Sequence, residues 1–213
     1  MNAVDKNIWT KLRSEAEDYI KSNENYKDFL ESLVLSNDDF ISSISLKLSR
    51  DLSQAWSFTE KKLYPGILQA LNSIEISKAI EMDLNAVISR DPATNTIIET
   101  FLFSKGFSAL QAYRASNYHW NSENLLSYFL QSRSSQVYGV DIHPAAKIGK
   151  GIMLDHATGI VIGETSVIED DVSIFQGVTL GGTGKEIGDR HPKVRKGVLI
   201  SSCLLYTSPS PRD

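Results

Sequence analysis

An acidic and an imidazole side chain lie next to each other at Asp155 and His156, inside the otherwise apolar stretch GIMLDHATGI at 151–160. A carboxylate in such surroundings needs a partner, because an unpaired buried charge costs free energy. An imidazole titrates near neutral pH, so it can accept a proton from an alcohol. His156 is therefore a candidate general base. Periodicity alone favours the alternative, a structural histidine with satisfied hydrogen bonds.

A second group of polar residues occupies GGTGKEIGDRHPK at 181–193, which has three glycines in its first four residues and five charged side chains. This composition predicts a loop that protrudes from a regular scaffold, a common place for functional residues. The guanidinium of Arg190 matches the geometry of a carboxylate. The alternative for Arg190 and His191 is a solvated loop charge. The spacing GxxxxGK[ST] is absent, so this is not a phosphate-binding P-loop.

The scaffold that carries both groups has an aliphatic residue every six positions. The two series are Ile142, Ile148, Leu154 and then Ile162, Ile168, Ile174, Leu180. A period of six, with glycine and small residues between, predicts a left-handed parallel β-helix over 138–200, interrupted by the loop. The second series is out of step with the first by two residues, which predicts one irregular corner between Leu154 and Ile162.

The preceding segment, 1–137, has a different pattern, with apolar residues at intervals of three and four. This spacing predicts helices near 8–20, 29–35, 40–48, 63–84, 95–105 and 107–132, with a break at Arg90-Asp91-Pro92. A plain helical bundle with solvated polar faces explains the same pattern. The expected fold class is α+β: an N-terminal helical oligomerisation domain, 1–137, followed by the β-helix, 138–200, which is incomplete at its C-terminal end.

Composition excludes several classes of protein. Hydrophobic residues make up 41 % and charged residues 23 %, with a net charge of −4, so the chain has no basic surplus to bind nucleic acid. No apolar run approaches the roughly 20 residues that span a bilayer, and the N-terminus lacks a secretory signal, so we expect no membrane association. Cys203 is the only cysteine, which excludes an intrachain disulfide and predicts a cytoplasmic location. A nucleophilic role for Cys203 is not expected.

Four stretches resemble the serine acetyltransferase family. They are RDPA at 90–93, KGFSALQAYR at 105–114, VDIHPAAKIGKGIMLDHATGIVIGET at 140–165, and DVSIFQGVTLGGTGK at 171–185 followed by GDRHPK. These hexapeptide-repeat enzymes make O-acetylserine from serine and acetyl-CoA, the first step from serine to cysteine. The resemblance runs from about Ala86 to Ile200 and implies that the chain is a serine O-acetyltransferase.

The resemblance implies roles for the acidic residues. Asp141 is expected to orient His156, which takes the serine hydroxyl proton, as a triad carboxylate orients its histidine. Asp91 and Asp155 are expected to hold the serine ammonium through charge-assisted hydrogen bonds. Asp91 also suits a helix-terminal cap beside Pro92, and the two roles are compatible.

The same resemblance places Arg190 and His191 on the substrate, and Gly182 and Thr183 near the pantetheine arm of acetyl-CoA. His143 lies in an Ile-His-Pro pattern that opens many hexapeptide coils, and we interpret it as a corner or interface residue. The expected reaction is direct attack of serine on the thioester, without an acyl-enzyme, because no cysteine is suitably placed.

The implied co-substrate is acetyl-CoA, and no metal is expected. The implied assembly is a homo-oligomer, with trimers formed by the coils, active sites between chains, and trimers paired through the helical domain. L-cysteine is the implied feedback inhibitor, acting on Asp91, Asp155 and Arg190. Family members bind cysteine synthase through a tail that ends in isoleucine. This chain ends in Pro-Arg-Asp, which argues against that partner.

The last residues, SSCLLYTSPSPRD at 201–213, contain two prolines and lack the hexad spacing, which predicts that they do not continue the β-helix. Our hypothesis is that they form a non-family tail on a truncated chain. Two rival functions follow: a catalytically dead subunit or assembly partner, and another hexapeptide O- or N-acetyltransferase that acts on a sugar or antibiotic.

Overall fold

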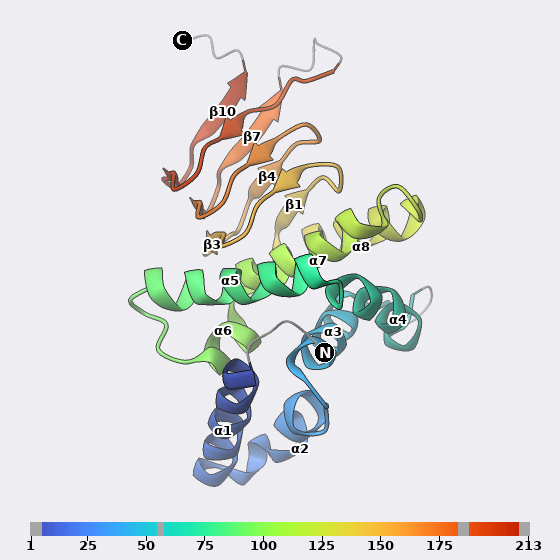
Figure 1. Cartoon of the computed structure of the whole chain (residues 1–213), viewed down its shortest axis with the longest axis vertical. Helices are drawn as coiled ribbons and strands as arrows, with labels where there is room; N and C mark the ends of the chain where they lie inside the picture. The colour runs from blue at the N-terminus through green and yellow to red at the C-terminus, as the bar shows by residue number, and fades with distance from the viewer. Residues whose placement is uncertain (1–5, 55–57, 183–187, 209–213) are drawn as a thin grey trace.

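The computed structural model describes residues 6–54, 58–182 and 188–208 (Figure 1). In the described residues, the regular elements are helical as far as Tyr138, and strands follow from Val140. The helical elements are α1 Lys6–Ser22, η1 Glu24–Tyr26, α2 Lys27–Leu30, η2 Glu31–Leu35, α3 Phe40–Leu52, α4 Glu60–Leu71, α5 Ile74–Arg90, α6 Ile97–Phe103, α7 Lys105–His119 and α8 Asn124–Tyr138.

Within the part of the chain that the structure describes, the strands are short and pair in parallel, in three sheets. We call the sheets side A (β1-β4-β7-β10), side B (β2-β5-β8) and side C (β3-β6-β9). The chain visits A, B and C in turn, so each circuit makes one coil of a prism, and the predicted fold of helices followed by a left-handed parallel β-helix is confirmed. The strands are β1 Val140–Ile142, β2 Lys147–Ile148, β3 Met153–Asp155, β4 Ile160–Ile162, β5 Val167–Ile168, β6 Ser173–Phe175, β7 Thr179–Gly182, β8 Lys193–Val194, β9 Leu199–Ile200 and β10 Leu205–Ser208.

Successive coils differ in length, and the differences locate the irregular segments. Ile142 pairs with Ile162, and Ile162 in turn pairs with Leu180, so the first coil is two residues longer than the second. The two extra residues lie between β3 and β4, so the predicted irregular corner is confirmed. Ile168 pairs with Val194, and this circuit is eight residues longer than the one from Ile162 to Leu180, because it contains the loop between β7 and β8.

One expectation about the end of the chain is wrong. Residues Leu205–Ser208 form β10, which pairs in parallel with β7 and places Leu205 beside Thr179. The prolines do not prevent this pairing, because Pro209 and Pro211 come after the strand. The start of the predicted loop also differs, since Gly181 and Gly182 still belong to β7.

Two of the expected helices are each divided in the structure. The stretch 63–84 forms α4 and α5, because Ser73 adopts an extended conformation with φ −64° and ψ 141°. The stretch 107–132 forms α7 and α8, separated by the polar turn at 120–123, where the Glu123 N–H bonds to the His119 carbonyl. Asn and Ser are present at both breaks, and their side chains compete with helical hydrogen bonding and favour turns.

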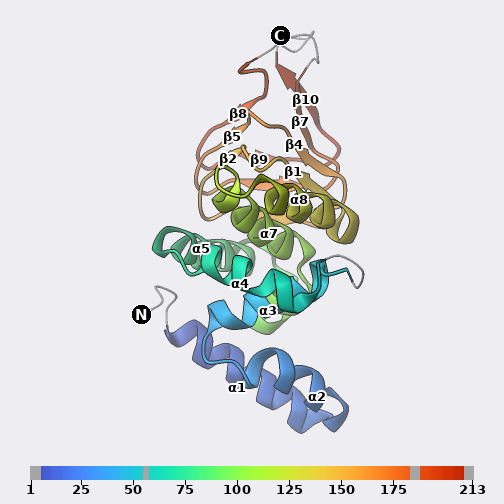
Figure 2. The same cartoon turned by 90° about the vertical axis from the view of Figure 1, so that its right-hand side faces the viewer.

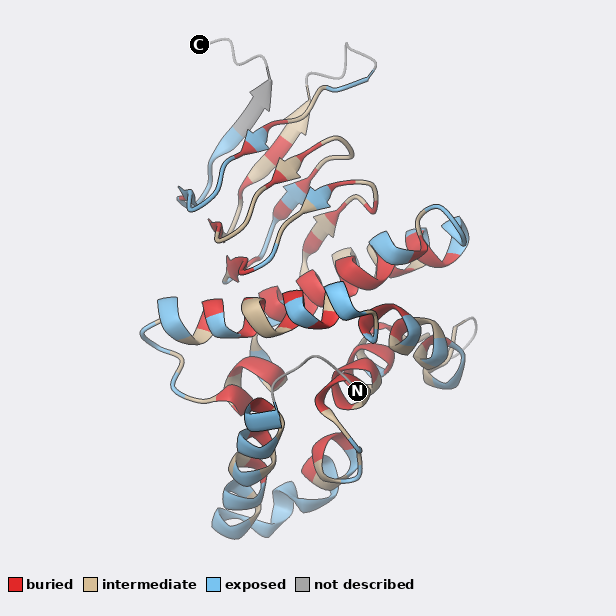
Figure 3. Cartoon of the chain, in the orientation of Figure 1, coloured by how far each residue is buried: buried red, intermediate tan, exposed pale blue. Residues whose placement is uncertain are grey.

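The β-helix stands on helices α5, α7 and α8, while α1 and α2 lie at the far end of the molecule (Figures 1 and 2). Buried residues are frequent in these supporting helices and in the coils (Figure 3). Gly106 makes a close approach of α7 to β3 possible, because a Cβ there would lie 2.0 Å from the Leu154 carbonyl oxygen. Across the described ranges, no helix is long and apolar enough to cross a membrane.

Candidate active site

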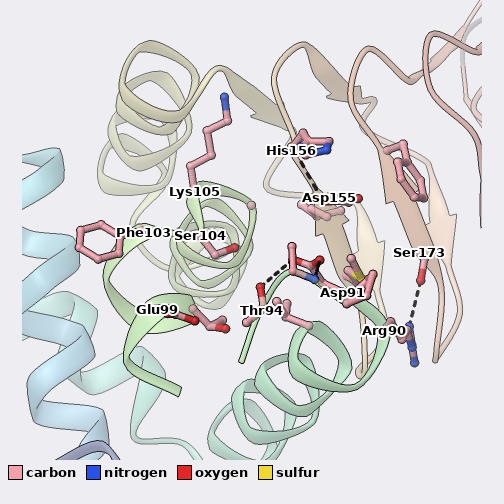
Figure 4. Close-up of a pocket in the computed structure, with 18 of the residues that line it drawn as sticks. Arg90, Asp91, Thr94, Glu99, Phe103, Ser104, Lys105, Asp155, His156 and Ser173 are labelled. Carbon is pink, nitrogen blue, oxygen red and sulfur yellow. Dashed lines mark hydrogen bonds and ion pairs between the residues drawn. The ribbon is translucent and has the colours of Figure 1, made fainter. Parts of the chain in front are cut away.

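A cavity of about 1050 Å³ lies where the end of α5, the start of α7 and the end of β3 meet. Asp91, Asp155 and His156 all line it (Figure 4). Three residues that the sequence analysis assigned to one substrate thus share one cavity, although Asp91 is distant from Asp155 in the sequence. The helical half therefore supplies one wall of the site and the β-helix the other.

His156 lies on the irregular corner and points away from the aliphatic interior. Its φ is 52° and that of Ala157 is 58°, a conformation that residues other than glycine rarely adopt. The Ala157 N–H bonds to the Asp155 carbonyl at 2.5 Å, and the Thr158 N–H bonds to the His156 carbonyl at 2.8 Å. These tight turns keep Ala157 inside and leave the His156 side chain 72 % exposed. Strained backbone of this kind often occurs at functional sites.

Asp155 and His156 form at most a loose ion pair. His156 Nδ1 lies 3.9 Å from Asp155 Oδ1, which is longer than a hydrogen bond. The Asp155 side chain is 19 % exposed and lines the cavity. Its carboxylate therefore remains available to a cation in the cavity, and its expected role in holding the serine ammonium stays a prediction.

Asp91 takes up the position immediately after α5 and makes a local turn. Its Oδ1 accepts the Ala93 N–H at 2.8 Å, and its Oδ2 accepts the Thr94 hydroxyl at 2.6 Å. Asp91 therefore stabilises the turn after α5, and it also lines the cavity. Each carboxylate oxygen has further lone pairs, so the turn leaves capacity for a ligand.

Asp141 has a different partner from the one expected. It lies in β1, and its Oδ1 accepts from Gln131 Nε2 of α8 at 2.8 Å. No hydrogen bond or ion pair joins Asp141 to His156 within the described ranges. The orienting role of Asp141 therefore stays a prediction.

The residues of the protruding loop gather at another corner of the prism, between sides A and B. Arg190 Nη2 pairs with Glu164 at 2.7 Å, and its Nη1 donates to the Gly188 carbonyl at 3.2 Å. The Arg190 guanidinium holds the pKa of the Glu164 carboxyl below its usual range. The sequence analysis missed Glu164, although its position directly after Gly163 at the start of a coil corner was a usable signal.

His191 lies against the same corner. Its Nδ1 accepts the Thr165 N–H at 3.1 Å and lies 2.8 Å from the Thr165 hydroxyl. Burial lowers the pKa of His191, and the neighbouring Arg190 charge lowers it further. A Cβ on Gly163 would lie 2.0 Å from His191 Cδ2, so the ring can occupy this place only over a glycine.

We call residues 155–159 the imidazole edge and residues 163–165 with 188–191 the guanidinium edge. The imidazole edge joins side C to side A, and the guanidinium edge joins side A to side B. The width of side A therefore separates the two edges, and neither Arg190 nor His191 lines the cavity at His156.

Two further positions that the sequence analysis named, Gly182 and His143, lie near the guanidinium edge. Gly182 ends β7, and a Cβ there would lie 3.0 Å from the Arg190 carbonyl oxygen. Thr183 lies outside the described residues. His143 forms a corner one coil below, where its Nδ1 accepts the Ala145 N–H at 3.1 Å and its ring packs edge-on against Trp120. Burial lowers the pKa of His143.

Several residues that line the cavity were not identified from the sequence. Thr94 bonds to Asp91, and Lys105 Nζ bonds to the Thr158 hydroxyl on the imidazole edge. Arg90 donates to the Ser173 hydroxyl at 3.2 Å. Arg90 and Lys105 are the first residues of the stretches RDPA and KGFSALQAYR, so their place inside these motifs was the available signal.

Comparisons with known proteins point to one family. A family model described as "Serine acetyltransferase, N-terminal" matches residues 8–112. A serine acetyltransferase of Buchnera aphidicola is 49 % identical over 199 residues, which are 92 % of this chain and 72 % of that protein. A probable serine acetyltransferase 4 of Oryza sativa is 47 % identical over 197 residues, 92 % of this chain and 62 % of its own length.

Solved structures give the same result. Soybean serine acetyltransferase complexed with serine matches with a TM-score of 0.90 and 42 % identity, covering 94 % of this chain and 83 % of that chain. Serine acetyltransferase of Brucella abortus in complex with coenzyme A matches with a TM-score of 0.91 and 39 % identity, covering 94 % and 81 %. The similarity therefore spans both the helical half and the β-helix.

Proposed function

This chain belongs to the serine acetyltransferase family, and we propose that it transfers the acetyl group of acetyl-CoA to the hydroxyl of L-serine, giving O-acetyl-L-serine and CoA. The observation that carries this proposal is the cavity that is lined together by an exposed imidazole, His156, and two carboxylates, Asp91 and Asp155. An alcohol that is attached to an ammonium group has the chemistry that such a cavity recognises.

In the proposed reaction, His156 accepts the serine hydroxyl proton while the oxygen attacks the thioester carbonyl carbon of acetyl-CoA. The tetrahedral intermediate then collapses with loss of CoA, and the imidazolium returns the proton to the sulfur. Binding both substrates side by side lowers the entropic cost of their encounter. No acyl-enzyme is required.

The serine ammonium is held by Asp91 and Asp155, and the carboxylate by Arg190 and His191. Since side A separates the two edges within one chain, we propose that a second copy supplies the guanidinium edge. A trimer about a threefold axis would place the guanidinium edge of one copy next to the imidazole edge of the next. Paired trimers would then use the helical half, and the site would be incomplete in a monomer.

For acetyl-CoA, we propose that the pantetheine arm runs past Gly182 and Thr183. The Brucella relative bound to coenzyme A supports this class of co-substrate. We also propose that Asp141 orients His156 when both substrates are bound. Asp141 would then exchange its hydrogen bond with Gln131 for one with the His156 ring. Apo side-chain geometry often tightens in this way when substrate binds.

Three further properties belong to the same proposal. L-cysteine carries the ammonium and carboxylate of serine, so it would compete for Asp91, Asp155 and Arg190 as a feedback inhibitor. A reduced, lone Cys203 suits the cytoplasm. Cysteine synthase is not a proposed partner.

The decisive experiment follows release of the CoA thiol when the purified chain is mixed with acetyl-CoA and L-serine, beside a panel of sugars. Serine-dependent release supports the proposal, and sugar-dependent release would assign a different hexapeptide acetyltransferase. A calorimetric titration with acetyl-CoA tests the remaining alternative, a non-catalytic subunit. If acetyl-CoA does not bind and no acceptor reacts, the chain is a non-catalytic subunit.

A further inference from the structure

A buried ion pair outside the cavity joins α5 and α7 to the first coil of the β-helix. Asp83 is fully buried and Arg114 is 6 % exposed. Arg114 donates from Nε to Asp83 Oδ2 at 2.8 Å and from Nη2 to the Gly149 carbonyl at 2.8 Å. Asp83 Oδ1 accepts the Ile152 N–H at 3.0 Å. Two charged side chains from two helices thus bind the backbone that leads into β3.

Two chain segments run from this ion pair to the cavity. Asp91 follows Asp83 by eight residues, which corresponds to about 12 Å of helix. Asp155 follows Ile152 by three residues, which corresponds to about 10 Å of strand. The two carboxylates proposed to hold the serine ammonium therefore lie at the ends of two segments that both begin at the Asp83–Arg114 ion pair.

Between the Asp83–Arg114 ion pair and the cavity, the end of α5 packs on β3 through few residues. Ala86, Val87 and Met153 form a small apolar cluster that is separate from the main core. At the cavity end, Arg90 donates to Ser173 of the second coil. A rotation of about 5° at the ion pair would displace a side chain about 12 Å away by about 1 Å, and errors of that size impair catalysis strongly.

We propose that Asp83 and Arg114 are positioning residues that set the separation of Asp91 and Asp155 and so fit the pair to one ammonium group. The inference rests on the proposed function, because it concerns the same substrate group. Charge-assisted hydrogen bonds need both carboxylates within hydrogen-bond distance of the nitrogen, so an altered separation weakens at least one of them.

The test compares Asp83→Asn with Tyr113→Phe. Asparagine keeps the size of the side chain and can still accept the Ile152 N–H, but it lacks the charge that pairs with Arg114. Tyr113 is the neighbouring residue on α7, and its hydroxyl donates to the Ala146 carbonyl at 2.5 Å. Tyr113→Phe therefore removes a contact between the same helix and the β-helix, but next to β2 rather than β3.

We expect Asp83→Asn to raise KM for serine about tenfold or more, with KM for acetyl-CoA within about twofold and kcat within about threefold. Tyr113→Phe should leave all three within about twofold. A purely structural role would lower the folded fraction, and with it the apparent kcat, without raising KM for serine more than KM for acetyl-CoA. Equal serine KM values in the two variants would overturn the proposal.

Calorimetry gives an independent readout by comparing L-serine with 3-hydroxypropanoate, which lacks the ammonium group. The wild type should prefer serine, and Asp83→Asn should lose about tenfold of that preference while Tyr113→Phe keeps it. A preference unchanged in Asp83→Asn refutes the positioning role. If the wild type neither binds nor acetylates serine, the proposed function itself is wrong. Arg114→Lys, which keeps the charge but not the fork, replaces Asp83→Asn should that variant not fold.

Discussion

The imidazole edge and the guanidinium edge flank the same side of the β-helix, yet their polar groups are in opposite states. The His156 ring is largely exposed and makes no hydrogen bond within the described ranges. At the guanidinium edge, Arg190 is paired with Glu164, and His191 with Thr165. The group proposed to move a proton is thus open to substrate, whereas the groups proposed to bind a carboxylate are held by partners that a ligand must replace.

This difference follows from how each edge departs from the regular coil. Two additional residues at the imidazole edge produce a tight turn with positive φ at His156 and Ala157, which turns a side chain outward. The circuit through the guanidinium edge contains eight additional residues, and Arg190 and His191 at its described end find partners on the coil below. The two-residue insertion therefore leaves a polar side chain exposed, whereas the polar side chains that follow the eight-residue insertion are paired.

The largest expected effect comes from removing the base at the imidazole edge. His156→Asn should lower kcat about 10²- to 10⁴-fold, because a positioned general base contributes about that factor. Asparagine tolerates positive φ, so the corner should keep its shape. The control is His143→Gln, which removes a corner histidine that lies one coil below the guanidinium edge and does not line the cavity. A kcat for His156→Asn within tenfold of wild type would remove the histidine from this role.

The next prediction fills the space beneath His191 at the guanidinium edge. Gly163→Ala places a Cβ where the ring now lies, and overpacking of this kind costs about 1–3 kcal/mol. We expect KM for serine to rise about tenfold, with a smaller change in kcat, because substrate binding is displaced and the base is not. Gly66→Ala, in helix α4 and outside both edges, would place a Cβ 3.0 Å from Leu126 Cδ2 and 3.7 Å from His119 Nε2, and it serves as control. Equal kinetics in the two variants would contradict a substrate role for His191.

A smaller effect is expected from Thr94→Val beside the imidazole edge. This change removes the hydroxyl that bonds to Asp91 Oδ2, and such a bond contributes about 1 kcal/mol. KM for serine should rise about fivefold, while KM for acetyl-CoA stays constant. Steady-state kinetics with each substrate varied in turn make the distinction. An unchanged serine KM would mean that the Ala93 N–H alone fixes the carboxylate.

Glu164→Gln should act in the opposite direction. The carboxylate competes with substrate for Arg190, and an exposed pair of this kind contributes about 0.2–1 kcal/mol. Serine should therefore bind up to about fivefold more tightly, as calorimetry would measure. Weaker binding would show that Glu164 organises Arg190 for the substrate and does not compete with it.

The smallest prediction concerns pH. His143 and His191 both have lowered pKa values, mainly because burial disfavours their charged forms. The folded state then binds fewer protons than the unfolded state as pH falls below about 6.5, so stability decreases on acidification. We expect Tm to fall between about pH 7.5 and about pH 5.5, and less so in a His143→Gln, His191→Gln double variant. Equal slopes would assign the loss to other groups.

The sequence predicts the scaffold well because its signals are local. The six-residue spacing of Ile162, Ile168 and Ile174 follows directly from one inward side chain per side of the prism. Helix breaks at Ser73 and within 120–123 were missed, because the apolar spacing continues across them. The strand at Leu205–Ser208 was missed as well, because strand pairing there rests on backbone hydrogen bonds and not on side-chain spacing.

The site was only partly predictable for a related reason. The spacing identifies Asp155 and His156 as residues of a corner, but the meeting of Asp91 with them depends on how α5 packs on the first coil. The partners of Arg190 and Asp141, namely Glu164 and Gln131, are rotamer choices that no periodicity records. Motifs therefore identify the reactive groups, and packing decides what each one touches.

The unequal coil lengths have a practical consequence. The residues in excess of a regular coil lie at corners, so the pairing of the strands and the stacking of the inward side chains do not depend on them. Corners could then be lengthened, exchanged or redesigned one at a time while the rungs above and below keep their alignment. A protein engineer looking for a chassis for new acyl acceptors could begin with the two corners next to side A.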